Sequence, residues 1–81
     1  MNNDNYVKKM FSLNLAAYVL YSTDIIPEIK RDETTNTCYC IFPECEGVQI
    51  AIRQYRDNKA TVQLKEFLEA LKEIRQMMHL I

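Results

Sequence analysis

The chain has 81 residues, a length that indicates one small domain. Apolar residues make up 48% of it, with one glycine and two prolines, so the composition excludes a disordered or low-complexity chain. Ten lysines and arginines against eleven acidic residues give a net charge of −1, without the basic excess that is typical of nucleic-acid-binding proteins.

Residues 1–10 are mostly polar and are expected to form a flexible N-terminal segment. The first strong pattern covers residues 11–21, whose apolar side chains point in almost every direction around a helix. This distribution indicates a helix enclosed on most sides, with Ser12 as its N-cap and residues 22–24 as its end.

Two β-rich runs follow, at residues 25–31 and 37–42, with a polar, turn-forming stretch between them. This arrangement predicts an antiparallel hairpin. Pro27 cannot donate a hydrogen bond to a neighbouring strand, so it places the first run at the edge of the sheet.

Residues 43–58 have the pattern of a second helix. Pro43 suits the first helical position, apolar residues recur at helical spacing from Val48 to Tyr55, and Asn58 is a plausible stop. Gly47 lies inside this helix, and a close approach to the hairpin would explain a glycine there.

The last and longest helix is predicted to have Thr61 as its N-cap and to carry one apolar stripe. The stripe consists of Leu64, Phe67, Leu68, Leu71, Ile74, Met78 and Ile81. The sequence therefore predicts a single α+β domain over residues 11–81, in the order αββαα, with a β-hairpin packed on three helices.

Several of these segments resemble a family known as a domain of unknown function, found in small proteins of low-GC Gram-positive bacteria, their phages and mobile elements. The resemblance is carried by the opening helix at residues 11–20, the Ile41–Phe42 strand end, the helix end at residues 55–58 and the Leu68, Leu71, Lys72 stretch. The Cys-x-Cys of the hairpin departs from that family. The resemblance implies a phage or prophage setting and supplies no activity.

The three cysteines form the one metal-like pattern, with His79 as a possible fourth ligand: Cys38, Cys40 and Cys45. A structural zinc site usually pairs two such knuckles, and this chain has no second one, so we interpret the three as small buried side chains and expect no metal or cofactor. Glu44 and Glu46 flank Cys45 and oppose thiolate formation, so we expect no catalytic residue and no enzyme activity.

Five basic residues are the best nucleic-acid candidates, provided that the hairpin base and the second helix lie side by side. They are Lys30, Arg31, Arg53, Arg56 and Lys59. The alternative interpretation is that these are ordinary surface charges, balanced by nearby acidic residues.

The chain closes on apolar residues that could extend beyond the domain's own core. Either this end covers that core, or it packs on a second copy, and we favour the second copy. The candidate residues for such a homodimer interface are Ile74, Met77, Met78, Leu80 and Ile81.

The leading interpretation is a non-enzymatic protein-interaction module, and the resemblance implies a phage or prophage protein acting on a host or phage partner. The alternative is a small nucleic-acid-binding accessory protein that uses the basic residues named above. An odd number of cysteines, a start without a secretory signal pattern and the lack of a membrane-spanning apolar run predict a cytoplasmic protein.

Overall fold

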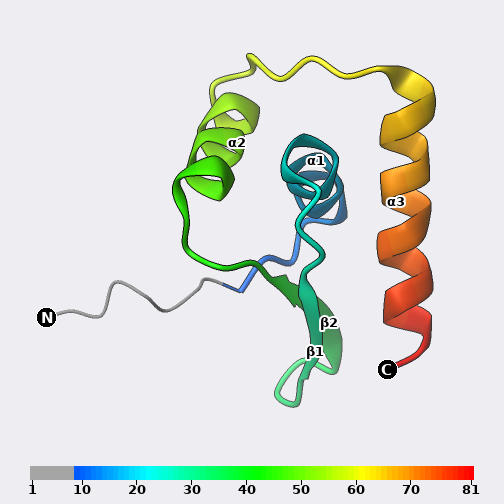
Figure 1. Ribbon diagram of the computed structural model, residues 1–81. Helices are drawn as coiled ribbons and strands as arrows, with labels where there is room; N and C mark the ends of the chain where they lie inside the picture. The colour runs from blue at the N-terminus through cyan, green and yellow to red at the C-terminus, as the bar shows by residue number, and fades with distance from the viewer. Residues whose placement is uncertain (1–8) are drawn as a thin grey trace, which may run out of the picture.

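The computed structural model describes residues 9–81, as three helices and a two-stranded antiparallel sheet (Figure 1). The elements are α1 (Leu13–Thr23), β1 (Glu28–Asp32), β2 (Thr37–Ile41), α2 (Glu46–Arg56) and α3 (Leu64–His79). The predicted α+β class and the order αββαα are confirmed. Of the predicted flexible segment, residues 1–8 lie outside the described part.

Helix α1 lies at the centre, with α2 on one side, α3 on the other and the hairpin beneath it (Figure 1). Five consecutive residues of α1, from Ala16 to Leu20, are buried, as a helix enclosed on most sides requires. Its start is capped as predicted, because Leu15 N–H donates to Ser12 Oγ at 3.2 Å. None of the helices within residues 9–81 is long and apolar enough to cross a bilayer.

The hairpin pairs β1 with β2 from Glu28↔Ile41 to Asp32↔Thr37. Strand β1 lies at the edge of the sheet, as predicted, but it begins at Glu28, so Pro27 lies just before the strand and not within it. One face of β2 carries Cys40, which is fully buried against the core. On the opposite face, the Tyr39 ring packs 5.4 Å from the ring of Phe11.

The other edge of β2 is occupied by the residue that leads into α1. Met10 N–H donates to the Cys40 carbonyl at 3.0 Å, and Cys40 N–H donates to the Met10 carbonyl at 2.9 Å. Met10 is 8% exposed and belongs to the core. The chain before α1 is therefore fixed against the hairpin from Met10 onward, and it passes beside α2.

Helix α2 begins later than the sequence predicts. Pro43 lies before the helix, and the N-cap is Cys45, whose backbone is extended at φ −136° and ψ 167°. The predicted stop is confirmed, because Asn58 adopts the left-handed conformation at φ 61°. Gly47 does not approach the hairpin: a Cβ at this position would lie 3.7 Å from Thr23 Cγ2 of α1.

Helix α3 also begins later, at Leu64. The N-cap of α3 is Gln63 instead of Thr61. Its backbone N–H donates a hydrogen bond to the Tyr21 hydroxyl of α1 at 2.9 Å, which fixes this N-cap to a helix distant in the sequence. Ala70 and Ile74 are the buried residues of α3. Leu64 and Leu68, which the predicted stripe included, are 67% and 49% exposed.

Candidate binding groove

A groove opens where the segment before α1 and the first turn of α1 face α2. It has a volume of about 430 Å³. Its lining residues come from two parts of the chain that are far apart in the sequence, residues 9–15 and 42–56: Lys9, Met10, Phe11, Ser12 and Leu15; and Phe42, Pro43, Glu44, Val48, Gln49, Ile52, Arg53 and Arg56. We call this set the α1–α2 groove.

The floor of the α1–α2 groove is apolar and continuous with the core. Met10, Phe42 and Val48 are 8%, 3% and 4% exposed, and Leu15 and Ile52 pack against the same core cluster. Because these side chains are held by the packing of the domain, the floor is preformed.

The rim of the groove carries three cationic side chains, Lys9, Arg53 and Arg56, against the single carboxylate of Glu44. That carboxylate accepts a hydrogen bond from Gln49 Nε2 at 2.8 Å. Arg53 and Arg56 are exposed neighbours in the last turn of α2, and within residues 9–81 neither has an acidic group at ion-pair distance. The rim is therefore electropositive.

Helix α2 presents these arginines to the groove because its other side is fixed on α1. The Tyr18 hydroxyl donates to Gln54 Oε1 at 2.8 Å, and the Tyr55 ring lies 6.2 Å from the Tyr18 ring. These contacts set the rotation of α2 about its own axis.

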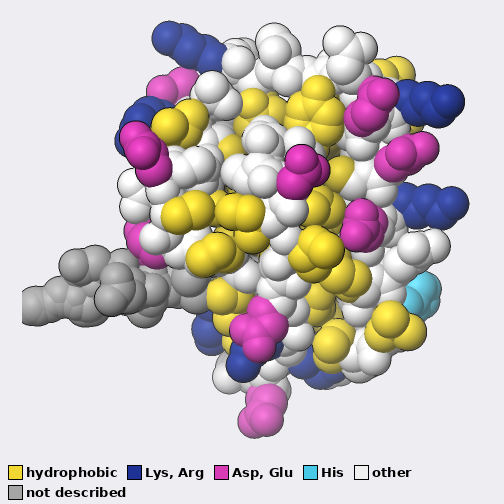
Figure 2. Space-filling model, viewed as in Figure 1, with side chains coloured by type: hydrophobic (Ala, Val, Ile, Leu, Met, Phe, Trp, Pro, Cys, Tyr) yellow, Lys and Arg dark blue, Asp and Glu magenta, His cyan; other side chains and the backbone are white. Residues whose placement is uncertain are grey.

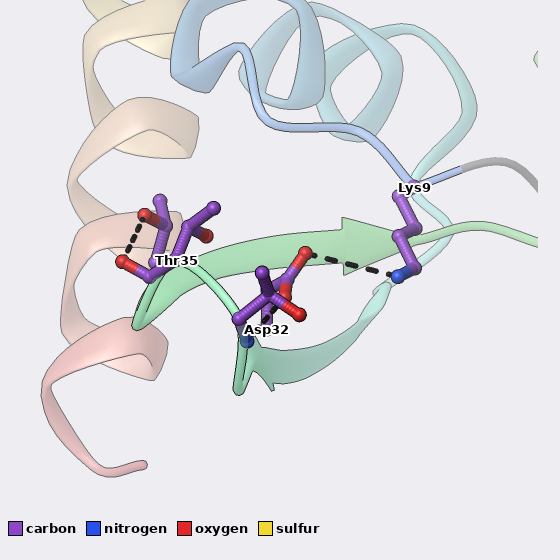
Figure 3. Close-up of polar contacts among 5 residues, drawn as sticks. Lys9, Asp32 and Thr35 are labelled. Atoms are coloured by element: carbon purple, nitrogen blue, oxygen red, sulfur yellow. Dashed lines mark hydrogen bonds and ion pairs between the residues drawn. The ribbon is translucent and has the colours of Figure 1, made fainter.

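Lys9 stands at the opposite rim and leans over the hairpin (Figure 3). Its Nζ lies 3.8 Å from Asp32 Oδ2 and 5.2 Å from the centre of the Tyr39 ring. The side chain of Lys9 is 57% exposed, so the ion pair contributes little to stability. The Asp32 carboxylate is fixed independently of Lys9, because its Oδ1 accepts a hydrogen bond from Thr34 N–H at 2.9 Å.

Of the five basic residues predicted from the sequence, the groove contains Arg53 and Arg56 and does not contain the other three. Lys30 and Arg31 are consecutive on β1, so their side chains leave opposite faces of the strand. Arg31 reaches toward the end of the chain, with Nη2 3.2 Å from the Ile81 carbonyl oxygen.

Cys38 and Cys40 lie two residues apart on β2, and Cys45 is the N-cap of α2. Cys40 is fully buried, and Cys38 and Cys45 are half-buried. Burial raises the pKa of the Cys40 thiol from 9.0 to about 11, and the neighbouring Cys38 adds to the effect. No group of three potential metal ligands forms among residues 9–81, and His79 lies exposed at the end of α3.

The candidate dimer residues divide into two sets. Ile74 is fully buried in the chain's own core and offers no surface to a second copy, and Met77 and Met78 pack against the same core. Leu80 and Ile81 are 86% and 51% exposed.

Sequence reasoning missed Lys9 and Met10 as groove residues, since both fell in the segment predicted to be flexible. The available signal was the apolar pair Met10–Phe11 directly before the Ser12 cap. That pair indicates a docked segment, but it does not identify Cys40 as its partner.

The fold and the groove together define a small α+β domain of αββαα order that carries a preformed apolar groove. A family model described as "Domain of unknown function (DUF5659)" matches residues 3–80, and the chain belongs to this family. No curated protein and no solved structure shows significant similarity to the chain.

Proposed function

We propose that the protein is a non-enzymatic protein-interaction module that binds its partner in the α1–α2 groove. The observation that carries this proposal is the combination of a preformed apolar floor with a few charged groups at the rim. A volume of about 430 Å³ is within the range of small-molecule pockets, so the groove has room for a few side chains of a partner.

The chemistry of the rim supports binding over catalysis. Arginine stays protonated in proteins, so Arg53 and Arg56 suit ion pairing and not proton transfer. The remaining charged groups of the groove are Lys9 and Glu44, and Glu44 is engaged with Gln49.

Binding of nucleic acid is the weaker alternative. The nucleic-acid hypothesis required one strip of five basic residues, whereas the groove includes two of them. In addition, the net charge of −1 gives no general attraction to phosphates. The setting that we propose from the resemblance is a phage or prophage protein in the cytoplasm, whose partner is a host or phage protein.

The proposal is tested by selecting random displayed peptides on the immobilised full chain. Gln49 is an exposed groove residue, and in Gln49→Trp the indole would fill the groove without replacing a core side chain. Gln76→Trp on α3 is the matched control, because Gln76 is also exposed and lies outside the groove.

We expect the enriched peptides to compete for one site, to bind Gln76→Trp like the wild type and to lose binding to Gln49→Trp. Peptides that bind both variants equally, or a selection that enriches no specific sequence, would contradict the proposal.

A further inference from the structure

We infer that the ligand of the α1–α2 groove is a short acidic segment of a protein chain in which apolar side chains alternate with carboxylates. This inference rests on the proposed function and identifies the chemistry of the partner at the same site.

The floor of the groove indicates that the ligand carries apolar side chains. Met10, Leu15, Val48 and Ile52 present aliphatic and thioether groups to the groove, between the cationic side chains of the rim. A ligand gains by placing Leu-, Ile- or Phe-type side chains there, since each Å² of apolar surface removed from water stabilises the complex by roughly 25 cal/mol.

The acidic half of the inference comes from charge complementarity. Arg53 and Arg56 are one turn apart on α2 and have no acidic partner at ion-pair distance within residues 9–81, whereas the Lys9 ammonium of the groove lining lies 3.8 Å from Asp32. Each guanidinium can form paired hydrogen bonds with a carboxylate. A ligand without negative charge would form no ion pair with these exposed guanidinium groups.

The same lining argues against a nucleic acid as the occupant. Single strands bind largely by stacking bases on aromatic rings. The two aromatic residues of the groove are Phe42, which is 3% exposed, and Phe11, which is 46% exposed and already packs on Tyr39. The groove therefore offers one partly open ring face.

The test uses three displayed peptide libraries on the immobilised full chain. The libraries share the same randomised apolar positions and differ at the alternate positions, which carry Glu, Gln or Lys. The charge-reversal variant is Arg53→Glu with Arg56→Glu, and Lys65→Glu with Lys72→Glu on α3 is the matched control, because all four residues are exposed.

We expect the wild type and the control to enrich the Glu library and the charge-reversal variant to enrich the Lys library. A selected Glu peptide should bind the charge-reversal variant about tenfold more weakly at low ionic strength, and the difference should shrink as salt is added. Since glutamates are unfavourable at the end of α2, Arg53→Gln with Arg56→Gln is a second variant, and circular dichroism checks the fold of each.

The outcomes separate the two proposals. Enrichment of the Gln or Lys library by the wild type, at a site blocked in Gln49→Trp, would overturn the acidic ligand and leave the groove as the binding site. Binding of a labelled oligonucleotide in place of any peptide, lost in the charge-reversal variant, would also overturn the inference. If no library yields a peptide sensitive to Gln49→Trp, both proposals are wrong.

Discussion

Cys40 is the residue at which the fold most clearly selects one protonation state. Its thiol is fully buried, and burial raises its pKa from 9.0 to about 11, with a further contribution from Cys38. The folded chain thus holds the Cys40 proton more tightly than the unfolded chain does. Stability from this group is complete below pH 9.0 and is lost as the pH rises toward 11.

The first prediction follows from this loss of stability with rising pH. Between about pH 8 and about pH 10.5, the Cys40 thiol should cost the wild type on the order of 2 kcal/mol of unfolding free energy. Other groups titrate in the same range, so the control is Cys40→Ala, which lacks this one contribution. Urea denaturation at both pH values measures the difference, and an unfolding free energy that falls equally in the two proteins would contradict the assignment.

Gly47 gives the second prediction at the residue scale. A Cβ at this position meets Thr23 Cγ2 at 3.7 Å, which is ordinary van der Waals contact, and the backbone needs no positive φ there. Gly47→Ala should therefore stabilise the protein by about 0.4–1 kcal/mol, through the lower entropy of the unfolded chain. Thermal unfolding measures this change, and a lower melting temperature would show that the space beside Thr23 is not available.

At the scale of the elements, the starts of the helices provide a matched test. Ser12 caps α1 through a hydrogen bond from Leu15 N–H, whereas Thr61 lies before α3 in the connection from α2. Ser12→Ala should cost about 0.5–2 kcal/mol, and Thr61→Ala should change stability by less than about 0.5 kcal/mol. Chemical denaturation of both variants and the wild type measures the two changes in unfolding free energy. Equal losses would contradict the structure and would mean that Thr61 caps α3, as the sequence predicted.

The comparison of Ser12 with Thr61 shows which helix starts could be predicted from the sequence. The start of α1 depends on Ser12 and the residues just after it, so local rules found it. The start of α3 depends on the hydrogen bond from Gln63 N–H to the Tyr21 hydroxyl, which joins residues from two elements. A local sequence pattern cannot indicate a contact between distant residues, and the predicted start at Thr61 was therefore wrong.

The sequence did not predict the groove, for the same reason, and it singled out two of the groove's residues as nucleic-acid candidates. Arg53 and Arg56 stood out from their charge and helical spacing, and the structure places both on the rim. The opposite side depends on the pairing of Met10 with Cys40, thirty positions along the chain, which no periodicity reveals. The predicted strip with Lys30, Arg31 and Lys59 assumed a proximity that topology alone decides.

At the scale of the whole molecule, the central position of α1 divides the surface. The groove lies on the α2 side, and the end of the chain lies on the α3 side, near the hairpin (Figure 1). Figure 2 shows hydrophobic side chains on the face where α1 lies between the other helices, with lysines and arginines toward the edges. A partner in the groove and a second copy at the end of α3 would therefore use different surfaces.

The homodimer stays a prediction. The surface left for it is smaller than the sequence suggested, because Ile74 is fully buried and Met77 and Met78 pack on the chain's own core. If Leu80 and Ile81 pair two copies, light scattering should give about twice the chain mass of 9.6 kDa. Leu80→Glu with Ile81→Glu should then restore the single mass with unchanged circular dichroism, and a wild type already at 9.6 kDa would rule the dimer out.

The position of the bound ligand is the most direct test of the central claim, that the α1–α2 groove is the binding site. The measurement is an amide chemical-shift titration of the isotope-labelled full chain with a peptide selected as described above. We expect the largest shifts at four residues that line the groove: Met10, Leu15, Val48 and Ile52. Shifts concentrated instead at Leu80 and Ile81, or along β1, would contradict the claim.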